Sequence, residues 1–160
     1  MEATIFYILA AVIVIATVFA ITEKHAVHAI VYLVTSFFAL AVIFYLLGAP
    51  LVAVFEVIIY AGAIMVLFLF VIMMLDLGHP EKATRPGGHD WWPASFLGVI
   101  TLGATLFLTT ARPFAAAAGA TFGIRDFAAT LFQRYGIAVE VISMQLLFAL
   151  VGALYLGRRK

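Results

Sequence analysis

The chain has 160 residues, of which 66% are hydrophobic and only 11% are charged, with a formal net charge of +1 at pH 7 and a mean hydropathy of +1.20. Soluble domains usually contain about 25% charged residues, so this composition excludes a water-soluble domain and indicates a lipid environment. No long Lys/Arg run is present, so no nucleic-acid partner is expected, and the absence of cysteine excludes disulfides and thiolate-bound metal or iron–sulfur sites.

Five apolar stretches follow one another along the chain, each long enough to cross a bilayer. A hydrocarbon core about 30 Å thick requires roughly 20 helical residues, because each residue rises about 1.5 Å. The stretches are too long for membrane β-strands and lack strand-like alternation. The sequence therefore predicts an all-α integral membrane helical bundle of about five transmembrane helices, forming a single membrane domain over residues 1–160. The expected helices span residues 3–21, 29–47, 51–75, 92–111 and 136–156.

The connections between these stretches differ in length and chemistry. Only Gly48, Ala49 and Pro50 separate the second stretch from the third, which predicts an antiparallel hairpin with Pro50 at the start of the third helix. Residues 76–90 combine glycine and proline with charges and are expected to form a polar connector. In residues 112–135, apolar side chains are interleaved with arginine and aspartate, which fits either a short helix at the membrane interface or a plain surface loop.

Glu56 is an unusual residue to find in the third stretch. It lies about five residues, or roughly 8 Å, past the start of the stretch, where a carboxylate is costly to expose to lipid. Intramembrane acids often belong to proton or ion paths, and a snorkelling residue at the membrane interface is the alternative. Tyr60 follows at i+4 on the same helix face, so its hydroxyl can extend a polar path from Glu56.

Beyond Tyr60 the third stretch holds only apolar side chains, so a proton path through it would require water to enter and the helix to change its packing. Gly62 permits an irregular backbone, and a π-bulge there would rotate the following residues relative to neighbouring helices. The alternative role of Gly62 is close packing against another helix, with Ala61 and Ala63 beside it.

Glu140 forms a second polar patch near the start of the fifth stretch, with Ser143 at i+3. It fits two roles equally, a proton relay or an ion pair with Arg134. The chain contains no phosphate-binding loop, nucleophile elbow or dinucleotide motif, so no catalytic or cofactor-binding residue is predicted. The cluster of Glu23, His25 and His28 lacks a helix to fix its spacing, and no metal site is predicted from it.

The third stretch resembles the third transmembrane helix of the subunit J family of proton-pumping NADH:quinone oxidoreductase, or respiratory complex I, known in mitochondria as the subunit 6 family. The matching run is EVIIYAGAIMVLFLFVIMML at residues 56–75. Weaker similarities lie in HAVHA at 25–29, GA at 48–49 and VEVIS at 139–143. The chain departs from the family at Ala26, where many members carry proline, so the first turn can differ in shape.

This resemblance implies a core subunit of the membrane arm, near the quinone chamber and the antiporter-like subunits, with no redox centre of its own. NADH, FMN, iron–sulfur clusters and quinone would belong to the assembly. The third helix of the family is associated with a π-bulge that gates a hydrated path, which implies a hinge at Tyr60, Gly62 and Val66 and a place for Glu56 on the proton path. With the residues singled out above, the candidate proton path consists of Glu56, Tyr60 and Glu140. The alternatives are an equivalent subunit of an ion pump driven by ferredoxin or another donor, and an independent small transporter.

The protein is expected in the bacterial inner membrane. The distribution of Lys and Arg predicts that its amino terminus lies outside and its carboxyl terminus in the cytoplasm, because the cytoplasmic side carries the excess of positive charge. One side of a five-span arrangement holds Lys24, Lys82, Arg85, Arg158, Arg159 and Lys160, and the other holds Arg112, Arg125 and Arg134.

This orientation can be tested with single cysteines, since the chain has none of its own. An impermeant thiol reagent confined to the cytoplasmic side should label Lys82→Cys and Lys160→Cys, and the same reagent outside should label Arg125→Cys. The opposite labelling pattern would reverse the orientation.

Overall fold

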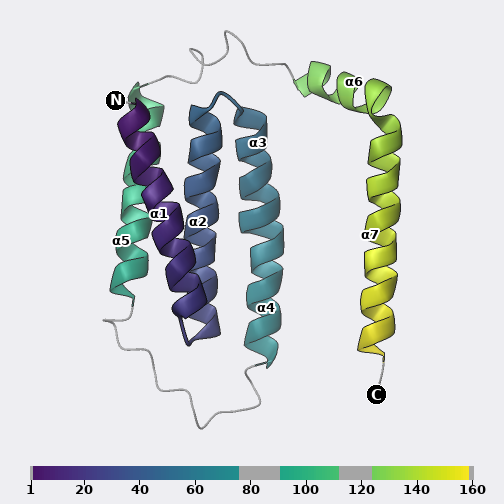
Figure 1. The fold of residues 1–160 in the computed structure, drawn as a ribbon, viewed down its shortest axis with the longest axis horizontal. Helices are drawn as coiled ribbons and strands as arrows, with labels where there is room; N and C mark the ends of the chain where they lie inside the picture. Colours follow the sequence, from purple (N-terminus) through teal and green to yellow (C-terminus); the bar gives the residue numbers. More distant parts are fainter. Residues whose placement is uncertain (1, 76–90, 112–123, 159–160) are drawn as a thin grey trace. The chain divides into compact units, whose positions relative to one another are not determined.

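The computed structural model describes residues 2–75, 91–111 and 124–158, and the regular structure of these residues is entirely helical (Figure 1). The chain divides into two compact units, residues 1–121 and residues 122–160. The first unit contains α1 (Glu2–Thr22), α2 (Ala26–Leu46), α3 (Pro50–Phe55), η1 (Glu56–Ile64), α4 (Met65–Leu75) and α5 (Trp92–Ala111). The second unit contains α6 (Ile124–Arg134) and α7 (Gly136–Gly157).

Five helices of the described residues are long and apolar enough to cross a membrane, which confirms the predicted all-α, five-span protein. They are α1, α2, α5, α7 and one 26-residue helix, Pro50–Leu75, in which α3, η1 and α4 follow one another without a break. This third span differs from the others because its middle section, η1, is a nine-residue π-helix.

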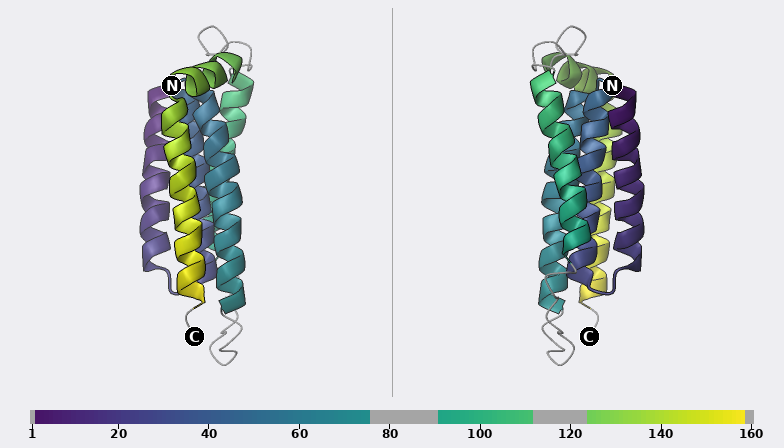
Figure 2. Two further views of the ribbon diagram at one scale, coloured as in Figure 1. Left: turned by 90° about the vertical axis from the view of Figure 1, so that its right-hand side faces the viewer. Right: turned by 90° about the vertical axis from the view of Figure 1, so that its left-hand side faces the viewer.

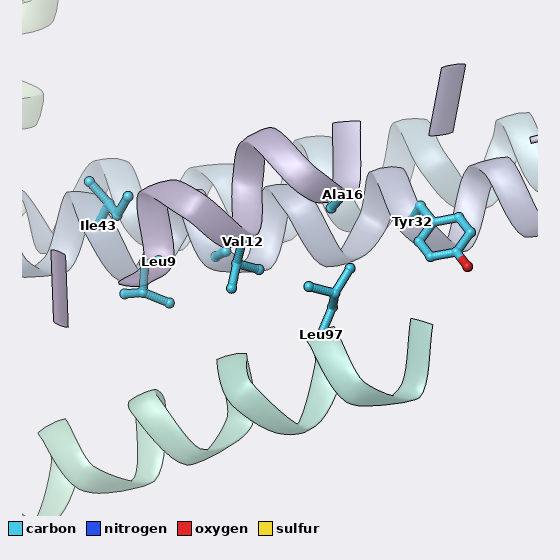
Figure 3. Close-up of a cluster of buried hydrophobic side chains, with 7 residues drawn as sticks. Leu9, Val12, Ala16, Tyr32, Ile43 and Leu97 are labelled. Carbon is cyan, nitrogen blue, oxygen red and sulfur yellow. The ribbon is translucent and has the colours of Figure 1, made fainter. Parts of the chain in front are cut away.

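In the first unit, α2 occupies the centre and packs against α1, α5 and the third span (Figure 2). The seam between α1, α2 and α5 buries a cluster of mostly aliphatic side chains (Figure 3), which consists of Leu9, Val12, Ala16, Tyr32, Ala39, Ile43 and Leu97. The small side chains in this seam let the helices approach closely, as is usual where helices meet in lipid. The hydroxyl oxygens of Thr17 and Ser36, 3.3 Å apart, add a polar contact between α1 and α2.

The predicted hairpin between the second and third spans is confirmed. Gly48 has a φ of +78°, in the left-handed region that favours glycine at the end of a helix. The amide of Gly48 donates to the carbonyl of Tyr45, and the amide of Ala49 donates to that of Phe44, so the end of α2 keeps its hydrogen bonds. Pro50 then begins α3 as expected.

The second unit consists of a short helix followed by a spanning helix. Within residues 112–135, a helix rather than a plain loop is observed from Ile124 to Arg134, while residues 112–123 and the connector at 76–90 lie outside the described residues. Tyr135 alone separates α6 from α7, and its backbone is not helical (φ −116°, ψ 19°). The chain turns there, so that α6 lies across the amino-terminal end of α7 (Figures 1 and 2).

Candidate functional site in the third span

The π-helix η1 contains the residues that the sequence singled out in the third span, from Glu56 through Tyr60 to Gly62. In a π-helix the backbone hydrogen bond joins residues five apart instead of four, so each hydrogen-bonded loop contains one extra residue. Such segments are rare, usually only one turn long, and often lie at functional sites. The structure therefore has an irregular backbone where a π-bulge was expected.

The buried side chains of the third span show how the π-helix changes the helix face that packs on α2. Before the irregular turn this face carries Ala53 and Glu56, and after it Ala61 and Met65. The step from Glu56 to Ala61 is five residues, whereas a regular α-helix would place Tyr60 on that face. Tyr60 is instead 48% exposed. The expectation that Glu56 and Tyr60 share one face assumed a regular α-helix, whereas the structure has a π-helix here and buries Ala61 more deeply than Tyr60.

Glu56 is buried, with 7% of its surface exposed, so a snorkelling side chain at the membrane interface does not fit it. Its Oε1 atom is buried and has no hydrogen-bond partner among the described residues. An unsatisfied buried acceptor costs about 1–3 kcal/mol, and more if it is charged. This oxygen can be satisfied by a water molecule or by a hydrogen-bond donor brought to it by a change in the helix.

Tyr60 contacts α2 through its ring. Its ring centroid lies 5.6 Å from that of Phe37, with an interplanar angle of 51°. Aromatic pairs at this separation contribute about 0.5–1.5 kcal/mol beyond the area that they bury. The contact therefore stabilises the position of Tyr60 beside α2. The sequence analysis missed Phe37, because an aromatic residue in an apolar helix gives no signal that separates it from ordinary packing.

Gly62 is crowded by its own helix. A Cβ atom at this position would lie 3.1 Å from the carbonyl oxygen of Val57, and no other atom counted among the described residues comes within 4 Å. Accommodating that Cβ would require a shift of a few tenths of an ångström within η1. The described residues thus give no support to close packing of Gly62 against another helix of this chain. Val66, the third expected hinge residue, lies just beyond η1 in α4 and is 62% exposed.

Glu140 lies in α7, in the second unit, and its side chain is exposed. Ser143 donates its hydroxyl to the carbonyl of Val139, 3.0 Å away, rather than to Glu140. No ion pair between Glu140 and Arg134 is found in the described part of the chain, and no group of three or more potential metal ligands occurs there. Within the second unit, the side chain of Glu140 is therefore open to other groups.

Comparisons with known proteins agree with the resemblance of the third span. The family model of NADH-ubiquinone/plastoquinone oxidoreductase chain 6 matches residues 16–156. NADH-quinone oxidoreductase subunit J of Pseudomonas aeruginosa is 41% identical over 119 residues, covering 71% of this chain and 70% of that protein. The Escherichia coli subunit J is 37% identical over 119 residues, covering 71% of this chain and 64% of that protein.

A cyanobacterial relative extends the comparison beyond subunit J. The NAD(P)H-quinone oxidoreductase chain 6 of Leptolyngbya boryana is 34% identical over 120 residues, covering 72% of this chain and 59% of that protein. The matched region thus spans most of this chain but less than two thirds of two of the three relatives. Because the family model covers residues 16–156 and the structure has five helices able to span a membrane, this multi-pass membrane protein belongs to the NADH-quinone oxidoreductase subunit J, or chain 6, family.

Proposed function

We propose that this chain is a membrane-arm subunit of proton-translocating NADH:quinone oxidoreductase, in which the third span gates proton movement by changing between π and α forms. The observation that carries the proposal is a π-helix beginning at a buried carboxyl group with an unpaired oxygen. NADH, FMN, the iron–sulfur clusters and quinone are bound by other subunits. The two units of this chain share one membrane domain beside the quinone-chamber and antiporter-like subunits, with the amino terminus outside.

The first step of the gate is a change in helix register. Removing the extra residue from the π turn rotates the following part of the span by about 100°, the angle between successive residues in an α-helix. Tyr60 then takes the place of Ala61 on the face of Glu56, four residues on, and Val66 in α4 turns with it. The backbone stays hydrogen-bonded in both forms, so the change is possible inside lipid.

The second step is a change in the proton partners of Glu56. In the π form the Oε1 atom of Glu56 has no partner among the described residues, and water can hydrogen-bond to it. In the α form the Tyr60 hydroxyl can approach the same carboxyl group and donate to it. The carboxyl group thus exchanges protons with water in one form and is separated from it in the other. Glu140 is the second acid of the proposed path.

The two forms are balanced by opposing contributions of similar size. The ring contact between Tyr60 and Phe37 favours the π form by about 0.5–1.5 kcal/mol, whereas the unpaired oxygen of Glu56 disfavours it by about 1–3 kcal/mol. A difference of about 1.4 kcal/mol changes the ratio of two forms tenfold. Small signals from a quinone site can therefore move this equilibrium.

The first prediction concerns Glu56→Gln, which keeps the shape of the side chain but removes its ionisable proton. Quinone-linked turnover and proton pumping in membranes should fall severalfold, while the complex remains assembled. NADH oxidation by an artificial acceptor, which bypasses the membrane arm, should persist. Wild-type pumping in this variant would exclude Glu56 as an essential relay.

Purification of the chain from membranes tests its assignment to the complex. A tagged chain purified in mild detergent should be recovered with flavin- and iron–sulfur-containing subunits that oxidise NADH. Recovery with iron–sulfur partners that accept electrons only from ferredoxin or another donor would favour the related ion pump. Recovery of the chain alone would favour an independent transporter.

The second prediction compares glycines in two spans. Gly62→Ala places a Cβ against Val57 inside η1, whereas Gly98→Ala in α5 adds a Cβ with no neighbour within 4 Å. The crowded carbonyl lies five residues back, along the repeat of the π-helix, so Gly62→Ala should favour the α form and slow quinone-linked turnover. Gly62→Val should slow it further, because a β-branched side chain adds bulk.

Native-gel abundance and both activities, measured on one membrane preparation, distinguish the possible roles of Gly62. If the third span is a gate, both Gly62 variants should contain a normal amount of the complex with normal artificial-acceptor activity. Their quinone-linked turnover should fall by up to about tenfold, which corresponds to a shift of about 1.4 kcal/mol between the π and α forms. Loss of the assembled complex in Gly62→Val would instead indicate close packing against a partner subunit. Normal turnover in an intact complex would contradict both roles, and Gly98→Ala should match wild type throughout.

The third prediction uses two adjacent phenylalanines of α2. Phe37 contacts Tyr60, whereas Phe38 is 43% exposed and provides a matched control. Phe37→Leu should weaken the π form and change quinone-linked turnover by up to about tenfold, the effect of losing about 1.5 kcal/mol. Phe37→Tyr, which retains a ring, should restore the rate. Equal effects of Phe37→Leu and Phe38→Leu would show that the ring contact does not set the register.

A further inference from the structure

Helix α6 has a position in the second unit that constrains its depth in the membrane. Helix α7 is 22 residues long and apolar enough to cross a bilayer, so its ends lie near the two membrane surfaces. Helix α6 ends one residue before α7 begins and lies across the amino-terminal end of α7 (Figures 1 and 2). The 11 residues of α6 are therefore placed close to the plane of one membrane surface.

The side chains of α6 are divided between an apolar face and a polar face. At about 100° per residue, Ile124, Ala128 and Leu131 fall on one face, and Asp126 and Gln133 fall on the opposite face. Ala128 and Leu131 are partly covered, whereas Ile124 is 73% exposed. No residue of α6 is buried, so within the second unit much of this apolar face is open.

Two arginines stand at the two borders of this apolar face. On the helical projection Arg125 lies beside Phe132, which is 67% exposed, and Arg134 lies beside Phe127 on the other border. Arginine at such borders can lay its aliphatic stem along the apolar surface and raise its guanidinium group to the lipid phosphates. The planar guanidinium group also matches phosphate oxygens in a bidentate arrangement.

From this placement we infer that α6 is a membrane-surface anchor, whose apolar face inserts among phospholipids while Arg125 and Arg134 bind their phosphate groups. Lipid fits better than a protein partner because α6 lies at the level where acyl chains meet headgroups. Because an arginine stands at each border of the apolar face, the helix can bind anionic headgroups along both of its long sides. The anchor fixes the depth and tilt of the amino-terminal end of α7, and it does not depend on the proposed gate.

Photocrosslinking in the whole complex tests what covers the apolar face. The photoreactive residue p-benzoylphenylalanine is placed at position 132 on the apolar border and, as a matched control, at position 133 on the polar face. Irradiation of native membranes should give phospholipid adducts at position 132 and few or none at position 133. Adducts of position 132 with another polypeptide, without phospholipid, would overturn the inference in favour of a protein interface.

A second measurement tests the arginines. The complex carrying the photoreactive residue at position 132 is reconstituted in vesicles of equal parts phosphatidylglycerol and phosphatidylcholine. Adducts should be enriched in phosphatidylglycerol, and the double variant Arg125→Gln/Arg134→Gln should lower that enrichment toward the one-to-one ratio of the vesicle. Arg158→Gln, at the other end of α7, should leave it unchanged. If phosphatidylglycerol remained enriched in the double variant, or were not enriched in the wild type, the arginines would not bind the lipid phosphates.

Discussion

Lipid offers no hydrogen bonds to a polypeptide backbone, and this constraint governs what the third span can do. A helix that must bend or change register inside a bilayer has to keep its amide and carbonyl groups paired with each other. A π-helix meets that requirement, because it changes the hydrogen-bond spacing from four residues to five without leaving groups unpaired. The nine residues from Glu56 to Ile64 are thus irregular in register while remaining helical. Among the side-chain atoms of the described residues, the Oε1 atom of Glu56 is the buried one without a hydrogen-bond partner.

The packing around η1 is suited to movement. The face that meets α2 carries the small side chains Ala53 and Ala61, which form few interlocking contacts. The larger Tyr60 lies to the side, where one ring contact with Phe37 contributes to its position. The seam of α1, α2 and α5 combines small and larger aliphatic side chains with a contact between two hydroxyl groups. Helix α2 therefore packs on both sides, against α1 and α5 and against the third span.

The second unit meets the membrane differently. Helix α7 has no buried residue among the described ones, so within the second unit most of its apolar surface is open. Glu140 and the short helix α6 both lie near the amino-terminal end of α7. An anchor at the surface would hold this end at a fixed depth, and with it the carboxyl group of Glu140. In this way the proposed lipid contact and the second acid of the proposed proton path depend on the same end of one helix.

The sequence by itself determined the membrane environment, the five spans and the hairpin at Gly48 to Pro50, because these follow from local properties such as the length of apolar runs and the backbone preferences of glycine and proline. The family resemblance led to an expected π-bulge, whereas the residues alone favoured close helix packing as the role of Gly62. Only the tertiary structure showed which residues share the face of Glu56, that Tyr60 contacts Phe37, and that Oε1 of Glu56 has no partner among the described residues. The reason is physical: these features depend on contacts between residues of different helices, such as Tyr60 and Phe37, which no local pattern in residues 56–64 reveals.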